Sequence, residues 1–294
     1  MIDLLCVGLG YSAVVFARRL RDAGAVVGGT TRSLARVDDL SAAGLPAVVF
    51  DGETASTAVT KALSTATHLV VSAAPDASGD SLLRCHHGDI ASAPRLRWIA
   101  YLSTVGVYGD WQGAEVDETT VPRPTAERGQ RRLAAEAAWL ELGARAGKAV
   151  QVFRLAGIYG PGQNALENLR RGEARRIVKP GQVFNRIHVE DIALTLAASL
   201  ARPRNGAIYN VTDNEPAPPQ VVISFAASLL GVPEPPAVEF ADADMTPMAR
   251  SFYSENKRVS NRLIRAELGV QLRYPTYREG IRALHAAGAE DPPG

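Results

Sequence analysis

Residues 4–13 are Leu-Leu-Cys-Val-Gly-Leu-Gly-Tyr-Ser-Ala, and this stretch decides the fold of the chain. Its apolar start predicts a buried strand, and a helical pattern follows it up to Gly24. Between them, a Gly-x-Gly-x-x-Ala turn supplies the positive φ and the close backbone approach that glycine permits, and the helix start presents N–H groups to a pyrophosphate. A turn with a purely structural role is the alternative. We expect a dinucleotide to contact the residues of this turn, which are Gly8, Gly10, Tyr11, Ser12 and Ala13.

The second expected strand, Val26–Thr31, indicates which dinucleotide is bound. In sheets that select NAD, an acidic residue at the end of this strand accepts a hydrogen bond from the ribose 2′-hydroxyl, whereas an Arg accommodates a 2′-phosphate. Here the strand ends in Gly-Thr-Thr-Arg-Ser, without an acid. The planar guanidinium of Arg32 suits a phosphate, and Thr31 adds a hydroxyl. We therefore predict NADP rather than NAD, although Arg32 can also be explained as the start of a solvated helix face.

Short β-branched runs alternate with helical stretches over the first two thirds of the chain. A parallel sheet produces this rhythm, because each crossover between parallel strands needs a helix. The sequence therefore predicts an α/β fold with a doubly wound parallel Rossmann sheet. The clearest helix is expected over about 124–147, where Leu133, Ala137 and Leu140 recur at helical spacing. The expected strands are Asp3–Gly8, Val26–Thr31, Ala47–Asp51, His68–Ala73, Trp98–Ser103, Val150–Leu155 and Ala207–Val211.

After Gly157 the rhythm weakens, and Pro and Gly become frequent. We therefore expect an NADP-binding domain over residues 1–157 and a smaller, mainly substrate-binding part over residues 158–294. The strand at about 207–211 returns from this second part to the sheet. The remaining expected elements are helices over Pro219–Leu230 and Asn261–Leu268 and a loose tail over Ala286–Gly294.

The composition excludes several classes of function. The 32 Lys and Arg residues nearly balance the 31 Asp and Glu residues, so the net charge of +1 provides no general attraction for nucleic acid or an anionic membrane. No run of 18 apolar residues could span a bilayer, and the apolar start Leu4–Ala17 lacks the basic residues that precede a signal sequence. With only Cys6 and Cys85, a disulfide framework is not expected, and we predict a cytoplasmic protein. The spacing around His86-His87 does not match a metal site. The oligomeric state cannot be predicted from the sequence, and a homodimer is one possible arrangement.

Further segments follow the glycine turn in an order and spacing that resemble a known family. Together they are similar to the extended short-chain dehydrogenase/reductases, the family of NAD-dependent sugar-nucleotide epimerases and dehydratases. The segments are Asp51, Ala73-Ala74, Leu102-Ser-Thr-Val-Gly-Val-Tyr-Gly109, Phe153-Arg-Leu-Ala-Gly-Ile-Tyr-Gly-Pro-Gly162, His188-Val-Glu-Asp-Ile-Ala193, Tyr209-Asn-Val211 and Leu268-Gly269.

The resemblance implies a role for several single residues. Asp51 would contact the adenine, Ala73 and Ala74 would line the path of the ribose and pyrophosphate, and Thr104 would place its hydroxyl near the reacting carbon. Each position also has a structural explanation. Asp51 can cap the turn that follows it, and Thr104 can end its strand with its hydroxyl bonded to the backbone.

The chain departs from the family at the catalytic pair, a Tyr and a Lys four residues apart. The segment Leu133-Ala-Ala-Glu136 sets the register, and it places Arg128 at the Tyr position and Arg132 at the Lys position. Two guanidiniums on one helix face repel each other unless an anion lies between them, so an anionic ligand is implied. Neither Arg can exchange a proton near neutral pH, so the usual proton relay is absent. A solvated, Arg-rich helix face is the alternative.

Other groups must then supply the proton if the chain is an enzyme. Tyr108, Tyr159 and His188 follow strands on the expected cofactor side, although the family uses the segment of His188 to order its substrate loop. Arg186 precedes this segment and can hold an acidic substrate. We therefore expect an NADP-dependent oxidoreductase or epimerase that acts on a small anionic molecule and lacks the usual Tyr-Lys pair. A non-catalytic NADP-binding sensor is the alternative.

Overall fold

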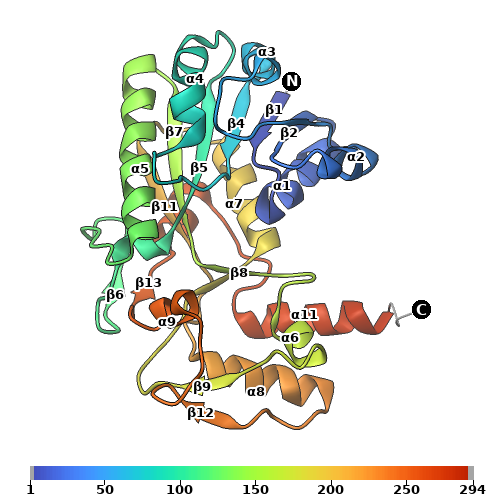
Figure 1. Ribbon diagram of the computed structural model, residues 1–294, viewed down its shortest axis with the longest axis vertical. Helices are drawn as coiled ribbons and strands as arrows, with labels where there is room; N and C mark the ends of the chain where they lie inside the picture. The colour runs from blue at the N-terminus through green and yellow to red at the C-terminus, as the bar shows by residue number, and fades with distance from the viewer. Residues whose placement is uncertain (1–2, 291–294) are drawn as a thin grey trace.

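A seven-stranded parallel sheet forms the centre of the protein, and the computed structural model describes residues 3–290 (Figure 1). The strand order is β11-β7-β5-β4-β1-β2-β3, and all six neighbouring pairs are parallel. This order confirms the predicted doubly wound sheet, which reverses its winding direction between β1 and β4. The strands are β1 (Asp3–Val7), β2 (Val26–Thr31), β3 (Ala47–Val49), β4 (His68–Val71), β5 (Trp98–Thr104), β7 (Ala149–Leu155) and β11 (Ala207–Val211).

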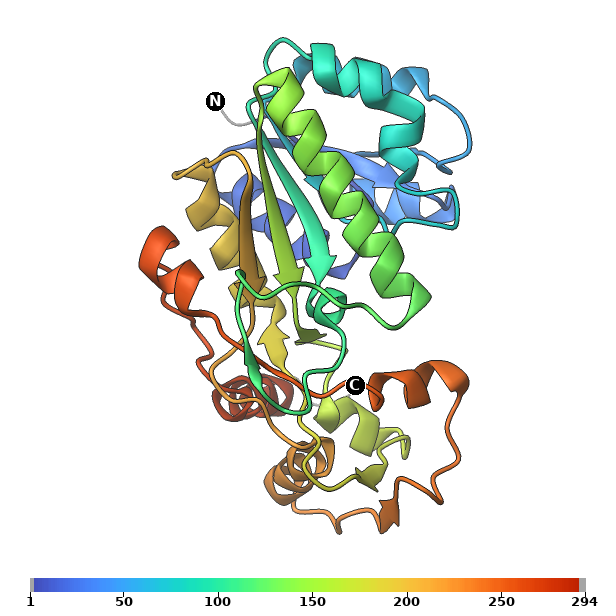
Figure 2. The ribbon, with the colours of Figure 1, turned by 90° about the vertical axis from the view of Figure 1, so that its left-hand side faces the viewer.

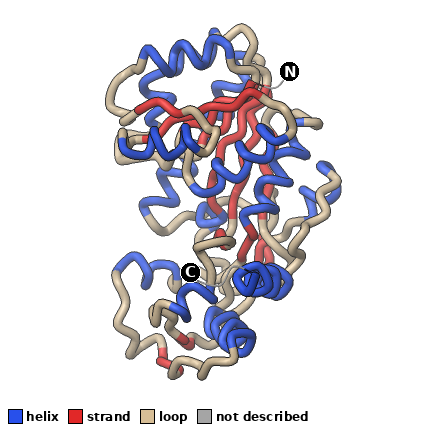
Figure 3. Tube along the Cα trace, turned by 90° about the vertical axis from the view of Figure 1, so that its right-hand side faces the viewer, coloured by secondary structure: helices blue, strands red, loops and turns tan. Residues whose placement is uncertain are grey.

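Helices cover both faces of the sheet (Figure 3). With the sheet they form two separate apolar cores. On one face, α1 (Tyr11–Asp22) packs beside α7 (Val189–Leu200), and α10 (Arg262–Leu268) lies next to them. On the other face lie α3 (Thr57–Thr65), α4 (Ser81–Ser92) and α5 (Glu127–Ala146). The short α2 (Ala35–Ala42) packs against β3.

The predicted long helix forms as α5, and two of the three predicted positions, Leu133 and Leu140, pack partly buried against the apolar cores. Its buried positions include Ala135, Trp139 and Leu142, whereas Ala137 is exposed. The indole N–H of Trp139 donates to the carboxylate of Asp80 at 3.1 Å. Trp139 is one of the largest fully buried side chains of the protein, and its N–H group is satisfied as well.

A smaller unit lies below the carboxyl ends of the strands, toward which the arrowheads of the sheet point (Figure 2). It contains α6 (Ala165–Arg170), α8 (Pro219–Leu230), α9 (Pro247–Phe252) and α11 (Tyr277–Glu290), and a pair of strands, β9 (Arg176–Val178) and β12 (Ala237–Glu239). Helices α6, α8 and α11 share one small core. Because α11 continues to Glu290, the prediction of a loose tail is wrong for residues 286–290, and residues 291–294 lie outside the described range.

Two short strand pairs join the units. Strand β8 (Gly157–Tyr159) pairs with β10 (Arg186–His188), and β6 (Glu115–Val116) pairs with β13 (Arg258–Val259). The second pair connects the segment after β5 with a segment near the end of the chain. Across residues 3–290, no helix combines the length and the apolarity needed to cross a membrane.

Candidate functional site

The glycine turn between β1 and α1 is held tightly against the end of β4. Gly8 has φ = +85°, and a Cβ atom at this position would lie 3.0 Å from the backbone nitrogen of Ala73. The N–H of Gly8 donates to Oγ1 of Thr30 at 3.0 Å, and the N–H of Leu9 donates to the carbonyl of Thr30 at 2.8 Å. Only glycine meets both the conformational and the steric requirement at residue 8.

In contrast, the space in front of Gly10 is open. Gly10 is the N-cap of α1, and a Cβ atom added to it would find its nearest neighbour, Oγ of Ser72, at 4.0 Å. No side chain caps the helix, so its first N–H groups can bind a ligand. An open cradle beside a helix N-terminus fits a pyrophosphate. Ser12 and Ala13 are buried in the first helical turn, while the hydroxyl of Tyr11 donates to the carbonyl of Pro161 at 2.9 Å.

Two arginines flank this turn on the side of β2. Arg32 is exposed and makes no hydrogen bond within the described part of the chain. Arg36 places Nη2 3.3 Å from the carbonyl oxygen of Leu9, so its guanidinium lies over the glycine turn. Thr31 is buried, and its Oγ1 accepts a hydrogen bond from the N–H of Ser33 at 3.3 Å. The two cations therefore stand beside the end of β2, where a 2′-phosphate would lie.

Asp51 lies in the loop after β3 and remains exposed. Its Oδ1 accepts a hydrogen bond from the N–H of Glu53 at 2.9 Å, which is the turn-capping role given above as the alternative. The second carboxylate oxygen is not used in this turn, so the adenine contact stays a prediction.

A cavity of about 740 Å³ lies between the carboxyl ends of β4 and β5 and the smaller unit. Open α/β sheets bind their ligands at this edge. The cavity brings together six predicted site residues: Ala74, Thr104, Arg128, Arg132, Tyr159 and Arg186. Its lining residues that were not predicted include Phe252, Tyr253, Glu255 and Lys257.

Arg128 and Arg132 of α5 both line this cavity, but each has its own protein partner. Arg132 donates from Nη1 to the carbonyl of Leu102 at 2.7 Å. Arg128 donates to Oγ of Ser251 at 2.9 Å, and its guanidinium lies 4.1 Å from the ring centroid of Phe252. Helix α9 is therefore attached to α5 across the cavity mouth.

Thr104 lies at the end of β5 and fulfils a structural role in addition to lining the cavity. Its Oγ1 accepts a hydrogen bond from the N–H of Gly106 at 3.0 Å and so caps the 3₁₀ turn Val105–Tyr108. The hydroxyl can still donate a hydrogen bond toward a ligand, because the cap uses only one of its lone pairs.

The structure corrects the prediction for Tyr108, which is fully buried and lies outside the cavity. Its hydroxyl donates to Oδ1 of Asn210 at 2.8 Å and accepts from Nη1 of Arg154 at 3.0 Å. Arg154 is also paired with Glu136 at 2.7 Å, with both side chains about 97% buried. Tyr108 therefore belongs to a buried polar network beneath the site and has no route to a substrate.

The prediction that His188 contacts the substrate is also corrected. The ring is buried, its Nδ1 accepts from the N–H of Glu190 at 3.2 Å as the N-cap of α7, and burial lowers its pKa to about 4. Neighbouring Asp191 accepts hydrogen bonds from the N–H groups of Arg273 at 2.6 Å and Tyr274 at 3.1 Å. The segment therefore joins α7 to the loop before α11, which is the structural explanation considered for this motif.

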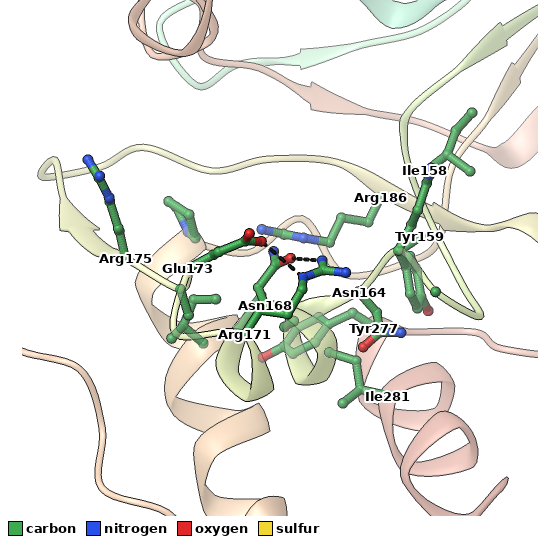
Figure 4. A pocket seen from close by; sticks show the side chains of 17 residues that line it. Ile158, Tyr159, Asn164, Asn168, Arg171, Glu173, Arg175, Arg186, Tyr277 and Ile281 are labelled. Atoms are coloured by element: carbon green, nitrogen blue, oxygen red, sulfur yellow. Dashed lines mark hydrogen bonds and ion pairs between the residues drawn. The ribbon is translucent and has the colours of Figure 1, made fainter. Parts of the chain in front are cut away.

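A second cavity of about 450 Å³ lies on the other side of Tyr159 and Arg186 (Figure 4). Arg186 forms part of the wall between the two cavities and donates from Nη1 to the carbonyls of Phe184 and Ala217, both at 3.0 Å. Arg171 lies opposite, with Nε 3.0 Å from a carboxylate oxygen of Glu173. A metal centre is not indicated, since the described residues contain no group of three or more His, Cys, Asp or Glu side chains that could hold an ion.

Asp213 follows β11 close to Arg186, and it supports a prediction on the pH dependence of stability. Burial raises its pKa from 3.8 to about 7, and its Oδ2 has no hydrogen-bond partner within residues 3–290. Between about pH 4 and 7, the Asp213 carboxyl is therefore protonated in the folded state and ionised in the unfolded chain. Its contribution to the free energy of unfolding falls as the pH rises through this range. We expect Asp213→Asn to raise the free energy of unfolding at pH 8 by about 2–4 kcal/mol, with little difference at pH 4. Urea unfolding at both pH values tests this, and an equal effect at both would contradict it.

The chain is similar in sequence and in structure to several known proteins. No protein-family model matches the chain. Protein YeeZ of Escherichia coli K12 is 32% identical over 190 residues, which are 64% of this chain and 62% of the length of that curated relative. A solved structure of a functionally unknown conserved protein from Silicibacter pomeroyi DSS is 51% identical, with a TM-score of 0.89 over 98% of this chain and 99% of the other.

Two further solved structures connect the fold with named enzymes. A protein from Methylobacillus flagellatus, proposed to be an NAD-dependent epimerase/dehydratase, is 28% identical, with a TM-score of 0.71 over 98% of this chain and 99% of the other. The dTDP-glucose 4,6-dehydratase of Bacillus anthracis, solved with NAD, is 17% identical, with a TM-score of 0.79 over 99% and 97%. The second likeness is one of fold alone. Together they confirm the predicted fold and the resemblance to the NAD-dependent epimerases and dehydratases.

Proposed function

We propose that the protein binds NADP and transfers hydride to or from a small anionic substrate. The proposal starts from the family and the fold: the chain belongs to the same family as the Silicibacter pomeroyi protein and has the fold of the extended short-chain dehydrogenase/reductases. The cavity beside the glycine turn carries this proposal. Four cationic side chains line it, those of Arg128, Arg132, Arg186 and Lys257, against the single carboxylate of Glu255. An excess of positive charge in a partly enclosed cavity favours an anion.

The glycine turn would hold the pyrophosphate through Gly10 and the first N–H groups of α1, where the open cradle fits it. Ala73 and Ala74 then extend from the turn to the cavity, because Gly8 packs on Ala73 and Ala74 is part of the cavity wall. A bound nicotinamide supplies or accepts hydride at the substrate carbon. The protein must orient the substrate and provide the proton.

The choice of NADP over NAD rests on Arg32 and Arg36 and on the lack of an acid at the end of β2. The structurally similar dehydratase holds NAD, so the preference has to be measured. We expect Arg32→Ala to weaken NADPH binding by about 1–3 kcal/mol, because charge-assisted hydrogen bonds to the 2′-phosphate are lost, and to leave NADH binding nearly unchanged. Calorimetry with both dinucleotides tests this, and equal losses for both would refute it.

Arg128 and Arg132 of α5 are expected to have separable roles. Arg132 lies against β5, where the family has its ribose-binding Lys, whereas Arg128 reaches toward α9. Arg132→Ala should therefore weaken NADPH binding several-fold, and Arg128→Ala should spare NADPH but impair an acidic substrate. Titrations at fixed ionic strength compare the two variants, because salt screens such charges. If both variants bind NADPH and every tested anion like the wild type, the proposed anion site is wrong.

Consumption of NADPH decides between this function and a non-catalytic sensor. The protein is incubated with NADPH and a panel of small carbonyl compounds, or with NADP and a panel of hydroxy acids and sugar nucleotides. Turnover of any compound above the buffer rate supports the enzyme. Tight NADPH binding without any turnover would favour a protein that reports the NADP state to a partner.

A further inference from the structure

Lys257 is the least expected residue of the main cavity. It directly precedes β13, and its side chain is only 7% exposed although it lines the cavity together with Thr104, Arg128 and Arg132. Its Nζ donates to the carbonyl oxygen of Gly109 at 2.7 Å and to Oε2 of Glu255 at 2.7 Å. An ammonium group has three N–H donors, so one donor is left for a ligand.

Lys257 is also the cationic residue of this cavity that can most readily release a proton. A guanidinium keeps its proton at any ordinary pH, which removes the arginines from consideration. Burial is the largest influence on Lys257 and lowers the pKa of its ammonium group, and the charge of Arg128 acts in the same direction. The carboxylates of Glu255 and Asp110 act against them. The chain has four lysines, and Lys257 alone among them is part of this cavity.

The other titratable groups near the cavity are poorer candidates for proton transfer. Burial raises the pKa of Tyr159, whose hydroxyl faces Gly280 in the interior. Burial also raises the pKa of Tyr253, and its ring packs against Phe184 and Phe240, with centroids 5.1 Å and 5.2 Å away. Both phenols therefore disfavour the phenolate form that the family uses.

We propose that Lys257, held in place by Glu255, transfers the proton to and from the substrate in this cavity. The proposal rests on the proposed function. In the direction of reduction, hydride from NADPH forms the new C–H bond at the carbonyl carbon, and the π electron pair moves to the oxygen. The ammonium group of Lys257 gives this oxygen a proton and becomes a neutral amine, which regains a proton from a hydronium ion of the solvent. The carbonyl compound, NADPH and one solvent proton thereby become the alcohol and NADP⁺.

The first test uses the wild-type chain and does not depend on its substrate. Glyoxylate, a small anionic aldehyde, forms an imine with a neutral amine, and cyanoborohydride reduces this imine to a stable carboxymethyl group. After brief treatment at pH 7, peptide mass spectrometry measures the labelling of all four lysines. We expect Lys257 to be labelled faster than exposed Lys61, because burial lowers the pKa of Lys257 and so raises the fraction of its neutral amine at pH 7.

Two controls make the labelling test specific. Lys148 is also buried, with its Nζ bonded to the carbonyls of Ala93 and Leu96 far from the cavity, and it should remain unlabelled. Glu255→Gln removes a charge that favours the ammonium form, so it should accelerate labelling of Lys257. Labelling of Lys257 that is no faster than that of Lys61 would overturn the proposal.

The second test measures proton transfer itself. With a compound that the wild type reduces, Lys257→Met and Lys257→Arg should each lower kcat about 100-fold while the dissociation constant of NADPH stays the same. The Arg variant keeps the charge but cannot release its proton, so wild-type turnover in Lys257→Arg would overturn the proposal. If the wild type reduces no compound, the proposed function fails, and the labelling rates still decide whether Lys257 is the reactive amine of the cavity.

Discussion

Gly10→Val is expected to raise the dissociation constant of NADPH about 100-fold or more and to leave the fold intact. The residue has φ = −87°, which valine adopts readily, and its Cβ would enter the open cradle in front of α1 and not the protein core. The added methyl groups would occupy the space of the pyrophosphate. Fluorescence titration with NADPH measures the loss, and circular dichroism checks the fold.

Two comparison variants separate lost binding from lost structure. Gly88→Val alters an exposed glycine of α4 with no neighbour within 4 Å of its Cβ position, and it should bind NADPH like the wild type. Gly8→Val should instead damage the fold, because φ = +85° and the nearby Ala73 leave no room for a side chain. A folded Gly10→Val protein with wild-type affinity would show that the turn is only structural.

Arg154→Met is expected to lower the free energy of unfolding by about 3–5 kcal/mol. The side chains of Arg154 and Glu136 are 3% and 2% exposed, and their closest atoms are 2.7 Å apart. Removing the guanidinium leaves the carboxylate of Glu136 buried, with Ser103 as its one remaining hydrogen-bond donor within residues 3–290, and it also takes a donor from Tyr108. Urea unfolding at pH 7 gives the difference.

The double variant Arg154→Met with Glu136→Met tests the cause. If the loss comes from an unpaired buried charge, replacing both partners with apolar side chains should restore most of the stability. The explanation would be contradicted if Arg154→Met lowered the free energy of unfolding by less than about 1 kcal/mol. It would also be contradicted if the double variant were as unstable as Arg154→Met.

The sequence was sufficient to predict the sheet because its strands are local patterns. The strands Val26–Thr31 and Ala207–Val211 form as predicted, and the others differ by only a few residues at their ends. Three small strand pairs were missed, since strands of two or three residues carry no periodicity of their own. The spacing of Leu133 and Leu140 indicates a side of α5 that is partly buried, but it carries no information on Trp139, whose ring is fully buried.

Site residues that follow the strands of the main sheet could be predicted from the sequence. Site residues from the segment before β13 could not. Thr104 and Arg132 follow motifs with a fixed register, and the cavity contains both. Lys257 and Glu255 belong to no motif, and they reach the cavity through the pairing of β13 with β6 and through hydrogen bonds from the side chains of Gln182 and Asn185. Tyr108 and His188 follow strands as expected, but burial and hydrogen bonding turn them away from the cavity.

The contact of Lys257 with Gly109 joins residues 148 positions apart, and this separation has a consequence for the biosynthesis of the protein. At about 5–20 residues per second, a ribosome needs roughly 7–30 s to progress from one to the other. The glycine turn and the first strands of the sheet have left the ribosome by then. If the chain binds NADP as proposed, the nascent chain can bind it before Lys257 has been added, and the ligand would stabilise the folding chain before it takes part in a reaction.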